Sequence, residues 1–361
     1  MRNRLLARCA GLLLLLAALA GCGRESLHSQ ESFVFGTRVE VLVWDRDAAR
    51  ARAATAEVLR EFDRLHRAYH AWQPSELTAL NDAIAAGRPH EVSAELAALI
   101  VEAQALAARG EYLFDPGIGA LVKLWGFHDD SFKPQLPDAG KLAALQRARP
   151  SIARLRVDGR RVAQGDFLRG VASTVPLDTA SHDFSVALDF GGYLKGVALD
   201  RAAATMKAHG IANALINIGG NVLALGAKGG QPWRVGIQHP RKSEPLATLD
   251  LRDGEAIGTS GDYQRYFELD GRRYSHLLDP RSAEPAVGTQ ALTVLIAPRG
   301  DGKAGLWSDV ASKPLFVAGA DWRRLATKLD ITQVLRVDAA GRIEVTEALR
   351  PRLTFVAGAA P

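Results

Sequence analysis

Cysteine is nearly absent from this chain of 361 residues. The two cysteines, Cys9 and Cys22, both lie near the N-terminus, and none follows them. Beyond residue 22 the chain can therefore form neither a disulfide nor a metal site that needs thiolate ligands. The composition is otherwise that of a globular protein, with 47% hydrophobic and 24% charged residues. The length suits one large domain or two modest ones.

Long apolar runs are scarce as well. The one that stands out is AGLLLLLAALAGC (10–22), which follows a start that carries Arg2, Arg4 and Arg8. About a dozen apolar residues are too few to span a bilayer, which needs about twenty. A basic start followed by a short apolar core is typical of an export signal.

The end of this run, ALAGC (18–22), resembles the lipoprotein box of bacteria, in which small residues admit the peptidase and the cysteine carries the lipid. We expect residues 1–21 to be a lipoprotein signal peptide, Cys22 to be lipidated and residues 22–31 to form a polar tether. An ordinary signal with a chance cysteine is the alternative. Lipidation predicts anchoring to a membrane on the periplasmic side. Because Gly23 is not the aspartate linked to inner-membrane retention, the outer membrane is mildly preferred.

A strong excess of either charge is also missing. Loss of residues 1–21 removes three arginines and no acidic residue, which lowers the formal net charge from +5 to +2. The basic isoelectric point therefore argues little for a nucleic-acid partner, and we expect none.

The periodicity of the remaining chain predicts a mixed α+β fold. Residues 32–44 alternate as a strand does, and small-residue turns separate further strands from residue 211 onward. Residues 154–163 read as a hairpin around Asp158-Gly159. The predicted helices span residues 46–70, 93–109 with Ser93 as N-cap and Gly110 as the stop, 141–148, and 309–328.

The stretch LDFGGYLKGVALD (188–200) places an acid, two glycines and a lysine where an apolar strand gives way to a helix. The helical apolar pattern begins at Leu194, so Gly191 and Gly192 lie at the helix entrance, where free N–H groups favour an anion. Lys195 in the first turn is disfavoured by the helix dipole unless an anion is bound. Asp189 indicates a hydroxyl, a ring N–H or a cation nearby. The alternative is an ordinary strand–helix turn with a solvated lysine.

Similar turns recur along the chain. NIGGN (217–221) and AIGTSGDY (256–263), which includes the hydroxyls of Thr259 and Ser260, read as small-residue loops. YSHLLDPRS (274–282) places His276 and Asp279 at a strand end, and YLFDPGIGALVKLWGF (112–127) combines a turn with aromatics. Each can be a plain turn. Together they favour a large polar ligand with a ring system.

The series of motifs resembles the ApbE family, the FAD:protein FMN transferases. The resemblance runs in order across about 290 residues, which makes it specific although no single motif is. The matching segments are FGTRVEV (35–41), WQPSELTALND (72–82), residues 112–127 and 188–200, GIANALINIGGNVLALG (210–226), WRVGIQHP (233–240), residues 256–282, and SDVASKPLFVAG (308–319).

The resemblance implies a fold of two packed α/β lobes with mainly antiparallel sheets over residues 32–356, with FAD bound between them. It implies transfer of FMN from FAD, with Mg²⁺, to a threonine or serine hydroxyl of a target flavoprotein of a respiratory or electron-transfer complex. The products are a phosphoester and AMP. Phosphoryl transfer needs mainly positioning and cationic stabilisation, which suits these residues.

The resemblance also assigns residues. Implied FAD contacts are Phe35, Trp72, Phe114, Asp115, Pro116, Asp189, Lys195, Thr259 and Leu278. Implied metal ligands are Gly192, through its carbonyl, Asp309 and Ser312. His276 resembles a histidine near the reacting phosphate and is predicted to act as a general base or to bind phosphate, with a structural strand-end histidine as the alternative.

Three departures from the family pattern affect these assignments. Phe35 replaces a methionine, and Ser282-Ala283 alter a turn. Lys313 stands where the family has a threonine ligand, and a protonated lysine cannot bind a metal. Its ammonium could act on the diphosphate in place of a cation or point to solvent. An FAD-binding accessory lipoprotein without efficient transfer, and an FAD pyrophosphatase that gives FMN and AMP, are therefore the alternative functions.

Overall fold

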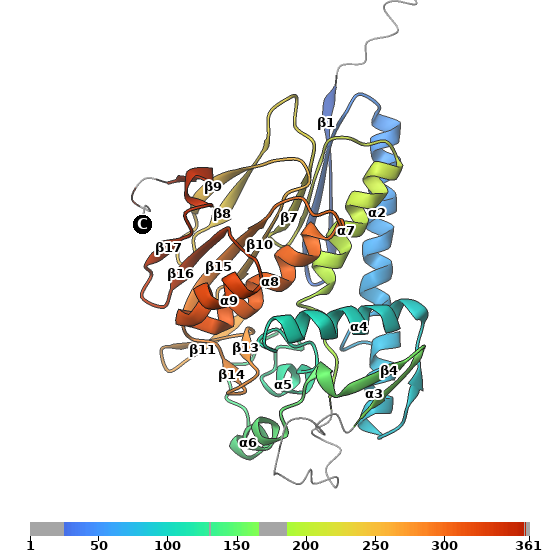
Figure 1. The fold of residues 1–361 in the computed structure, drawn as a ribbon, viewed down its shortest axis with the longest axis vertical. Helices are drawn as coiled ribbons and strands as arrows, with labels where there is room; N and C mark the ends of the chain where they lie inside the picture. The colour runs from blue at the N-terminus through green and yellow to red at the C-terminus, as the bar shows by residue number, and fades with distance from the viewer. Residues whose placement is uncertain (1–24, 130, 166–185, 357, 359–361) are drawn as a thin grey trace, which may run out of the picture.

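The computed structural model describes residues 25–129, 131–165, 186–356 and 358. Within these residues the chain forms an antiparallel sheet of eight strands, in the order β1-β2-β6-β7-β10-β15-β16-β17 (Figure 1). The strands are β1 (Ser26–Val34), β2 (Thr37–Asp45), β6 (Ala214–Ile218), β7 (Asn221–Leu225), β10 (Ala256–Gly261), β15 (Thr289–Ile296), β16 (Val334–Asp338) and β17 (Ile343–Val345). The predicted α+β class is confirmed.

Helices cover one face of this sheet. They are α2 (Ala48–Ala68), α7 (Leu194–Ala208), α8 (Ala304–Ala318) and α9 (Trp322–Lys328), which follows a short 3-10 turn. Alternate strand residues such as Ile216, Leu292 and Val294 point into the core that these helices share. The sheet and its helices make up the larger lobe (Figure 1).

The opposite face packs against a second sheet, of β18 (Leu353–Phe355), β9 (Pro245–Leu251) and β8 (Trp233–Gln238). The intervening strand residues, such as Leu215, Ile257 and Leu295, join Trp233 in a separate core there. Which face a strand residue occupies therefore decides whether it can approach the helices.

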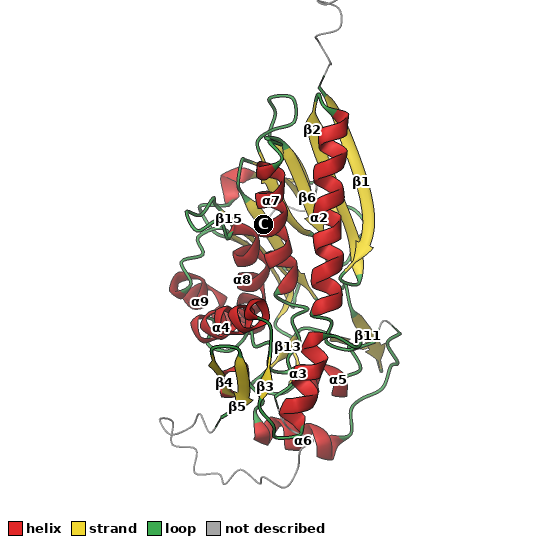
Figure 2. Cartoon of the chain, turned by 90° about the vertical axis from the view of Figure 1, so that its right-hand side faces the viewer, coloured by secondary structure: helices red, strands yellow, loops and turns green. Residues whose placement is uncertain are grey.

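A smaller lobe lies beyond one end of α2 (Figure 2). It consists of α3 (Glu76–Ala85), α4 (Ala94–Arg109), α5 (Gly119–Leu124), α6 (Ala139–Ala148), a 3-10 turn (Ile152–Arg154) and the small sheet β3 (His90–Glu91), β5 (Arg161–Gln164) and β4 (Leu155–Asp158). Leu80, Leu96 and Ile100 of this lobe belong to the same core as α2 and α7. The two lobes are thus packed together, as expected.

An aromatic cluster joins the lobes at the hairpin of β11 (Tyr266–Leu269) and β12 (Arg272–Ser275). Phe267 and Tyr274 of the hairpin stack at a centroid distance of 5.1 Å, and Trp125, which follows α5, stacks on both. A short pair of strands, β13 (Leu278–Asp279) and β14 (Glu284–Pro285), follows. His276 lies between β12 and β13, so this cluster fixes its position.

Several predicted elements are confirmed. Helix α4 begins after Ser93, whose hydroxyl accepts the amide N–H of Leu96, and ends before Gly110. Helices α2, α6 and α7 and the β4–β5 hairpin also lie where the sequence predicts them.

The predicted strand 32–44 is wrong, because a turn at Phe35 and Gly36 divides it into β1 and β2. Both turn residues have positive φ angles, 57° and 68°, which is the geometry of a tight hairpin. Strand β1 extends back to Ser26, so residues 26–31 of the predicted tether are paired with β2. The predicted signal peptide (1–21) and Cys22 lie outside the described residues.

Three further predictions need correction. The predicted loop 256–263 contains strand β10. The segment 187–190 is not a strand: Ala187 makes a single bridge with Ile118. The last helical stretch begins at residue 304 and is divided near Gly319, whose φ is 59°. Among the described residues, no helix combines the length and the apolar content that crossing a membrane requires.

Candidate functional site

Helix α8 carries a buried acid–base pair. The Asp309 side chain is fully buried, and its Oδ1 accepts a bond from the Lys313 ammonium at 2.5 Å. The same ammonium donates to the main-chain carbonyl of Asp309 at 2.8 Å. The second carboxylate oxygen accepts the amide N–H of Gly196, in the first turn of α7, at 2.9 Å. Both oxygens of Asp309 are therefore engaged.

Two glycines bring α7 and α8 close enough for this contact. A Cβ atom on Gly196 would lie 2.7 Å from Cα of Leu306 and 2.8 Å from Cβ of Asp309. A Cβ atom on Gly305 would lie 2.7 Å from Cβ of Leu199. Since larger residues would separate the helices, these glycines position Asp309 at the entrance of α7.

Strand β10 holds α8 from its other side. A Cβ atom on Gly258 would lie 2.2 Å from the carbonyl oxygen of Ser308. Two residues along the strand, the Ser260 hydroxyl bonds the Ser312 hydroxyl at 2.9 Å. Gly258 and Ser260 thus both face α8, which fixes the helix turn that carries Asp309.

Positive charge gathers beside this pair. Lys195, in the first turn of α7, has its pKa lowered by burial and by the nearby charges of Lys313 and Arg265, against the opposing effect of Asp309. Within the described part of the chain, the Lys195 ammonium makes no hydrogen bond or ion pair with a side chain, and Lys313 already holds Asp309. Among the residues that the structure describes, no side chain caps the N-terminus of α7. This arrangement favours an anion.

His276 faces the same cations. Its Nδ1 lies 3.1 Å from the carbonyl oxygen of Arg265, which also accepts the amide N–H of His276 at 3.0 Å. A carbonyl only accepts, so Nδ1 carries the proton and Nε2 keeps its lone pair. Burial, then the charge of Arg265, and to a smaller extent Lys195 and Lys313, lower the pKa of His276 to about 3. The imidazole is therefore neutral and presents Nε2 as an acceptor.

The lowered pKa predicts a pH dependence of stability. Between pH 6.5 and about 3 the unfolded chain binds a proton at His276 that the folded chain does not, so this contribution to stability is complete above pH 6.5 and is lost as the pH falls. The slope is at most about 1.4 kcal/mol per pH unit. Urea unfolding of wild type and His276→Gln at pH 7 and pH 5 measures this contribution. The free energy of unfolding should fall less between the two pH values in the variant than in wild type. Equal losses would contradict the lowered pKa.

Asp189 lies at the entrance of α7. Its Oδ1 accepts the amide N–H of Gly191 at 2.8 Å, and its own amide donates to the carbonyl of Pro116 at 2.8 Å. Burial raises the pKa of Asp189, whereas the charges of Arg265 and His70 oppose this. Arg265 is therefore near enough to act electrostatically on both Asp189 and His276.

Aromatic rings border the site near Arg265. The Phe35 ring contacts Phe62 and His66 at centroid distances of 6.0 and 5.7 Å. A phenylalanine in the left-handed region costs about 1–2 kcal/mol, and such strain is concentrated at functional sites. A Cβ atom on Gly36, the next residue, would lie 3.8 Å from the Arg265 guanidinium. The β1–β2 turn is thus part of this region.

Trp72 follows a histidine turn in which Nδ1 of His70 accepts the amide N–H of Trp72 at 3.0 Å. Its indole meets the ring of His128 edge-on at 5.7 Å. Because the charge of His70 acts on Asp189, this turn lies on the same side of the protein as the α7 entrance.

Other predicted contacts have structural roles. Oδ1 of the buried Asp115 accepts the amide N–H groups of Gly117 and Ile152, each at 2.8 Å, and burial raises its pKa. Phe114 is a core residue, and its ring would lie 3.7 Å from a Cβ atom on Gly192. Leu278 is buried in the aromatic cluster. These contacts of Phe114, Asp115 and Leu278 are structural. Direct contact of these residues and of Pro116 with FAD stays a prediction.

Thr259, a predicted FAD contact, lies apart from this cluster. It lies between Gly258 and Ser260, which face α8, so its side chain occupies the opposite face of the sheet. There its hydroxyl bonds that of Thr293 at 2.9 Å. The structure does not bring Thr259 together with Asp309, whereas its neighbour Ser260 does reach α8.

Arg265 is the residue that sequence reasoning missed. It acts on Asp189, Lys195 and His276, and its guanidinium donates to the carbonyls of Phe127 and Asp129 at 2.9 and 3.1 Å. It stands in the stretch 256–282 that contains His276, yet nothing in the local pattern separates it from the neighbouring surface arginines.

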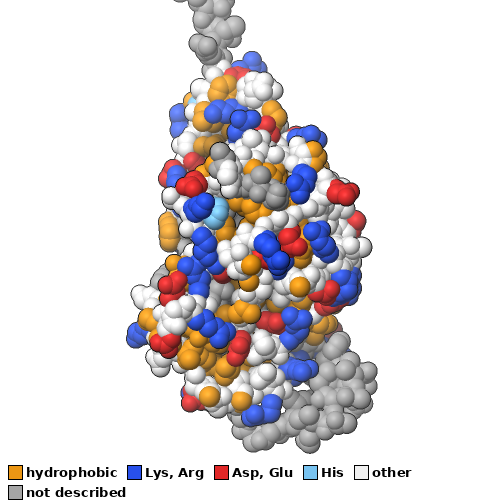
Figure 3. Space-filling model, turned by 90° about the vertical axis from the view of Figure 1, so that its left-hand side faces the viewer, with side chains coloured by type: hydrophobic (Ala, Val, Ile, Leu, Met, Phe, Trp, Pro, Cys, Tyr) orange, Lys and Arg blue, Asp and Glu red, His pale blue; other side chains and the backbone are white. Residues whose placement is uncertain are grey.

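Charge on the outer surface is mixed. On the face that carries the C-terminal strands, basic and acidic side chains are interspersed with apolar patches (Figure 3).

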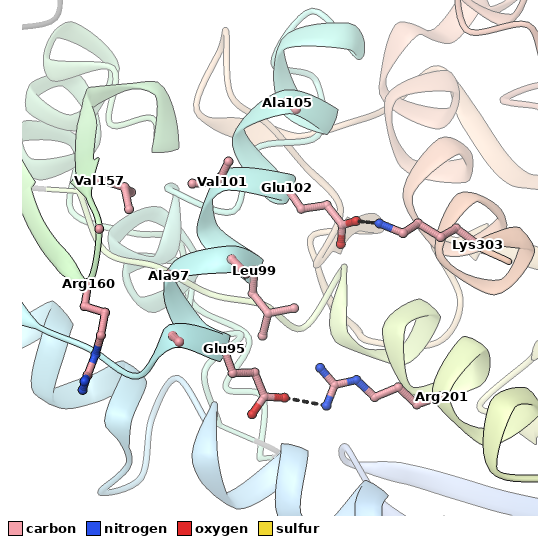
Figure 4. Close-up of a pocket in the computed structure, with 13 residues that line it drawn as sticks. Glu95, Ala97, Leu99, Val101, Glu102, Ala105, Val157, Arg160, Arg201 and Lys303 are labelled. Carbon is pink, nitrogen blue, oxygen red and sulfur yellow. Dashed lines mark hydrogen bonds and ion pairs between the residues drawn. The ribbon is translucent and has the colours of Figure 1, made fainter. Parts of the chain in front are cut away.

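A groove of about 930 Å³ lies elsewhere, between α4 and the β4–β5 hairpin (Figure 4). Its apolar wall is mainly alanine from α4, with Leu99 and Val101 of the same helix and Val157 of β4. Both of its acids pair with bases, since Glu95 bonds Arg201 and Glu102 bonds Lys303, and the remaining base, Arg160, donates to the carbonyl of Val92. Since two of its three bases already hold carboxylates, the groove is a weaker candidate for a phosphate ligand than the entrance of α7.

Comparisons with known proteins agree with this architecture. Solved structures with the same fold include the ApbE protein from Thermotoga maritima, at a TM-score of 0.77 and 28% identity, covering 91% of this chain and 99% of that chain. The Pseudomonas stutzeri flavinyl transferase ApbE in its apo form has a TM-score of 0.73 at 26% identity, with 91% and 97% covered. The fold is therefore that of the ApbE flavin transferases.

The sequence matches the model of the ApbE family over residues 35–335, and the chain belongs to that family. A Rhodobacter capsulatus protein named FAD:protein FMN transferase is 39% identical over 334 residues. The match covers 92% of this chain but 60% of that relative. A Treponema pallidum protein of the same name is 31% identical, with 81% of each chain covered. The family is thus one of transferases.

The predicted metal ligands do not fit a divalent cation as they are arranged. Both oxygens of Asp309 are bound, and the Ser312 hydroxyl bonds Ser260 and the carbonyl of Asp309. A Cβ atom on Gly192 would lie 2.7 Å from Cε of Lys313, so the lysine covers this glycine. Within the described ranges, no group of three or more His, Cys, Asp or Glu side chains could hold a metal ion.

Proposed function

We propose that this protein transfers FMN from FAD to a threonine or serine hydroxyl of a target flavoprotein, forming a phosphoester and releasing AMP. The observation that carries the proposal is the half-buried Lys195 ammonium, which has no side-chain partner among the described residues and lies near Lys313, Arg265 and a neutral His276. A diphosphate supplies the negative charge that this cluster requires.

The reaction is a displacement at the phosphorus of the FMN half. The acceptor hydroxyl oxygen forms a bond to this phosphorus, and the bond from phosphorus to the bridging oxygen breaks. AMP leaves with that oxygen. Lys195 and Arg265 stabilise the charge that develops on the phosphate oxygens, which is the main task in phosphoryl transfer.

His276 receives the proton of the attacking hydroxyl at Nε2. With a pKa of about 3 the free imidazole is a weak base, because burial and then the charges of three nearby cations disfavour its protonated form. A bound diphosphate places negative charge beside the same cations and raises the pKa of His276 again. The group then becomes basic where the substrate is present, which suits general base catalysis.

The aromatic border is proposed to receive the rings of FAD. Phe35 and Trp72 offer apolar surface near Arg265, and Asp189 offers a carboxylate to a hydroxyl or ring N–H. We also propose that the target belongs to a respiratory or electron-transfer complex. The protein is proposed to carry a lipid anchor at Cys22 and to lie on the periplasmic side of a membrane, with a mild preference for the outer one. The leader sequence supports the last two.

One assay distinguishes transfer from its alternatives. The purified protein is incubated with FAD and an acceptor flavoprotein domain, with and without Mg²⁺. Flavin fluorescence that stays with the acceptor after denaturation supports FMN transfer. FMN and AMP without labelling indicate an FAD pyrophosphatase. FAD binding without turnover indicates an accessory binding protein, and no affinity for FAD at micromolar concentrations overturns the proposal.

Lys195→Gln should weaken FAD binding about 10- to 150-fold, because a hydrogen bond to a charged group contributes about 1.5–3 kcal/mol. Equilibrium dialysis with FAD measures the effect. Lys207→Gln is the matched control, since Lys207 is exposed near the other end of the same helix. An unchanged dissociation constant in Lys195→Gln would show that the diphosphate binds elsewhere.

A further inference from the structure

We propose that the Lys313 ammonium is a built-in cation that takes the place of a divalent metal ion, so that this chain acts on a diphosphate without bound Mg²⁺. The statement about catalysis rests on the proposed function. The statement about the cation site does not, because it concerns the contacts of Asp309 alone.

The geometry of the ammonium supports this assignment. Nζ of Lys313 lies 2.5 Å from Oδ1 of Asp309 and 2.8 Å from the carbonyl oxygen of the same residue. It thus has a carboxylate and a carbonyl oxygen as neighbours, the donor types that a hard cation takes in proteins. A metal ion bound to Oδ1 would lie close to the Lys313 ammonium, and the two positive charges would repel each other.

The surroundings keep the lysine in this position. Its methylene groups lie against Gly192, where any side chain would collide with Cε and Cδ. The Ser312 hydroxyl is held by Ser260, and Gly196 holds the second oxygen of Asp309. Lys313 is also near enough to act electrostatically on Lys195 and His276, so the positive charge faces the proposed diphosphate site.

Three substitutions separate the charge from the packing. Lys313→Met keeps the length and the apolar contact with Gly192 but removes the charge. Lys313→Thr removes the charge, frees Oδ1 of Asp309 and adds a hydroxyl. Lys313→Arg keeps the charge. Thermal unfolding of each variant identifies any that fails to fold, and Lys313→Met is then compared with Lys313→Thr.

The first measurement is the binding of Mn²⁺ alone. Protein that has been stripped of metal with EDTA is titrated with Mn²⁺, and the EPR signal of the free ion reports how much is bound. Wild type and Lys313→Arg are expected to take up no Mn²⁺ at up to about 1 mM, whereas Lys313→Thr takes up one ion per chain. Uptake of one ion per chain by wild type, lost in Asp309→Asn, would overturn the proposal whether or not FMN transfer is found.

Transfer to an acceptor domain is the second measurement. In EDTA, wild type is expected to keep its rate within twofold of that with 5 mM Mg²⁺. Lys313→Thr is expected to lose at least tenfold in EDTA and to recover with Mg²⁺, and Lys313→Met to lose as much with little recovery. A wild-type rate that vanishes in EDTA and returns with Mg²⁺ would overturn the proposal. Absence of transfer under every condition counts against the proposed function, and Mn²⁺ binding then decides the cation site.

Discussion

Replacement of His276 by glutamine is expected to lower the rate of FMN transfer about 10²- to 10⁴-fold while the affinity for FAD changes little. Glutamine can still donate a hydrogen bond to the Arg265 carbonyl, as Nδ1 of His276 does at 3.1 Å, but it cannot accept the proton of the attacking hydroxyl. The effect should therefore fall on kcat, because the imidazole acts in the chemical step and the cations provide most of the binding.

The pH dependence provides an independent test of the same role. The profile of kcat reports the enzyme–substrate complex, in which the diphosphate raises the pKa of His276 above the value of about 3 in the free protein. An acid limb above pH 3 is therefore expected in wild type and should be missing in His276→Gln. His209→Gln is the control, since His209 pairs with Glu57 at the far end of α7. A kcat within threefold of wild type in His276→Gln would assign the histidine a structural role.

Much of the fold could be predicted because the local signals agree with the tertiary structure. Helix α4 is an example: the Ser93 cap, the apolar periodicity and Gly110 all indicate the same limits. The β1–β2 turn could not be predicted, because Phe35 has a φ of 57° and bulky residues rarely adopt positive φ angles. Strand β10 looked like a loop for a similar reason: its small residues reflect the close approach of α8, which the sequence does not show.

The candidate site divides in the same way. Lys195, Asp309, Lys313 and His276 were predicted as site residues, and the structure brings them near enough to interact electrostatically. Arg265 was missed because its role depends on a main-chain carbonyl and on neighbours from several segments. The orientation of Thr259 could not be predicted, since strand alternation assigns a face only after the partner helix is known. Tertiary contacts therefore decide which of several plausible polar residues belong to the site.

Gly258→Ala is expected to destabilise the protein by about 3 kcal/mol, within the range for overpacking a close contact. The added methyl group would lie 2.2 Å from the Ser308 carbonyl oxygen, and the neighbouring carbonyl carbon would be 2.6 Å away. Because both atoms belong to the main chain, helix α8 must move as a unit. For a chain of 361 residues the melting temperature should fall by about 4 °C.

The same displacement should also reduce activity in molecules that remain folded. Ser308 precedes Asp309, so a shift of α8 changes the distance from the Asp309 carboxylate to Gly196 and the position of the Lys313 ammonium. Calorimetry measures stability, and the transfer assay at 15 °C measures activity below the transition. Gly300→Ala is the matched control, since a Cβ atom there meets nothing within 4 Å. If Gly258→Ala melts within 1 °C of wild type and remains fully active, the contact between β10 and α8 does not set the geometry of the site.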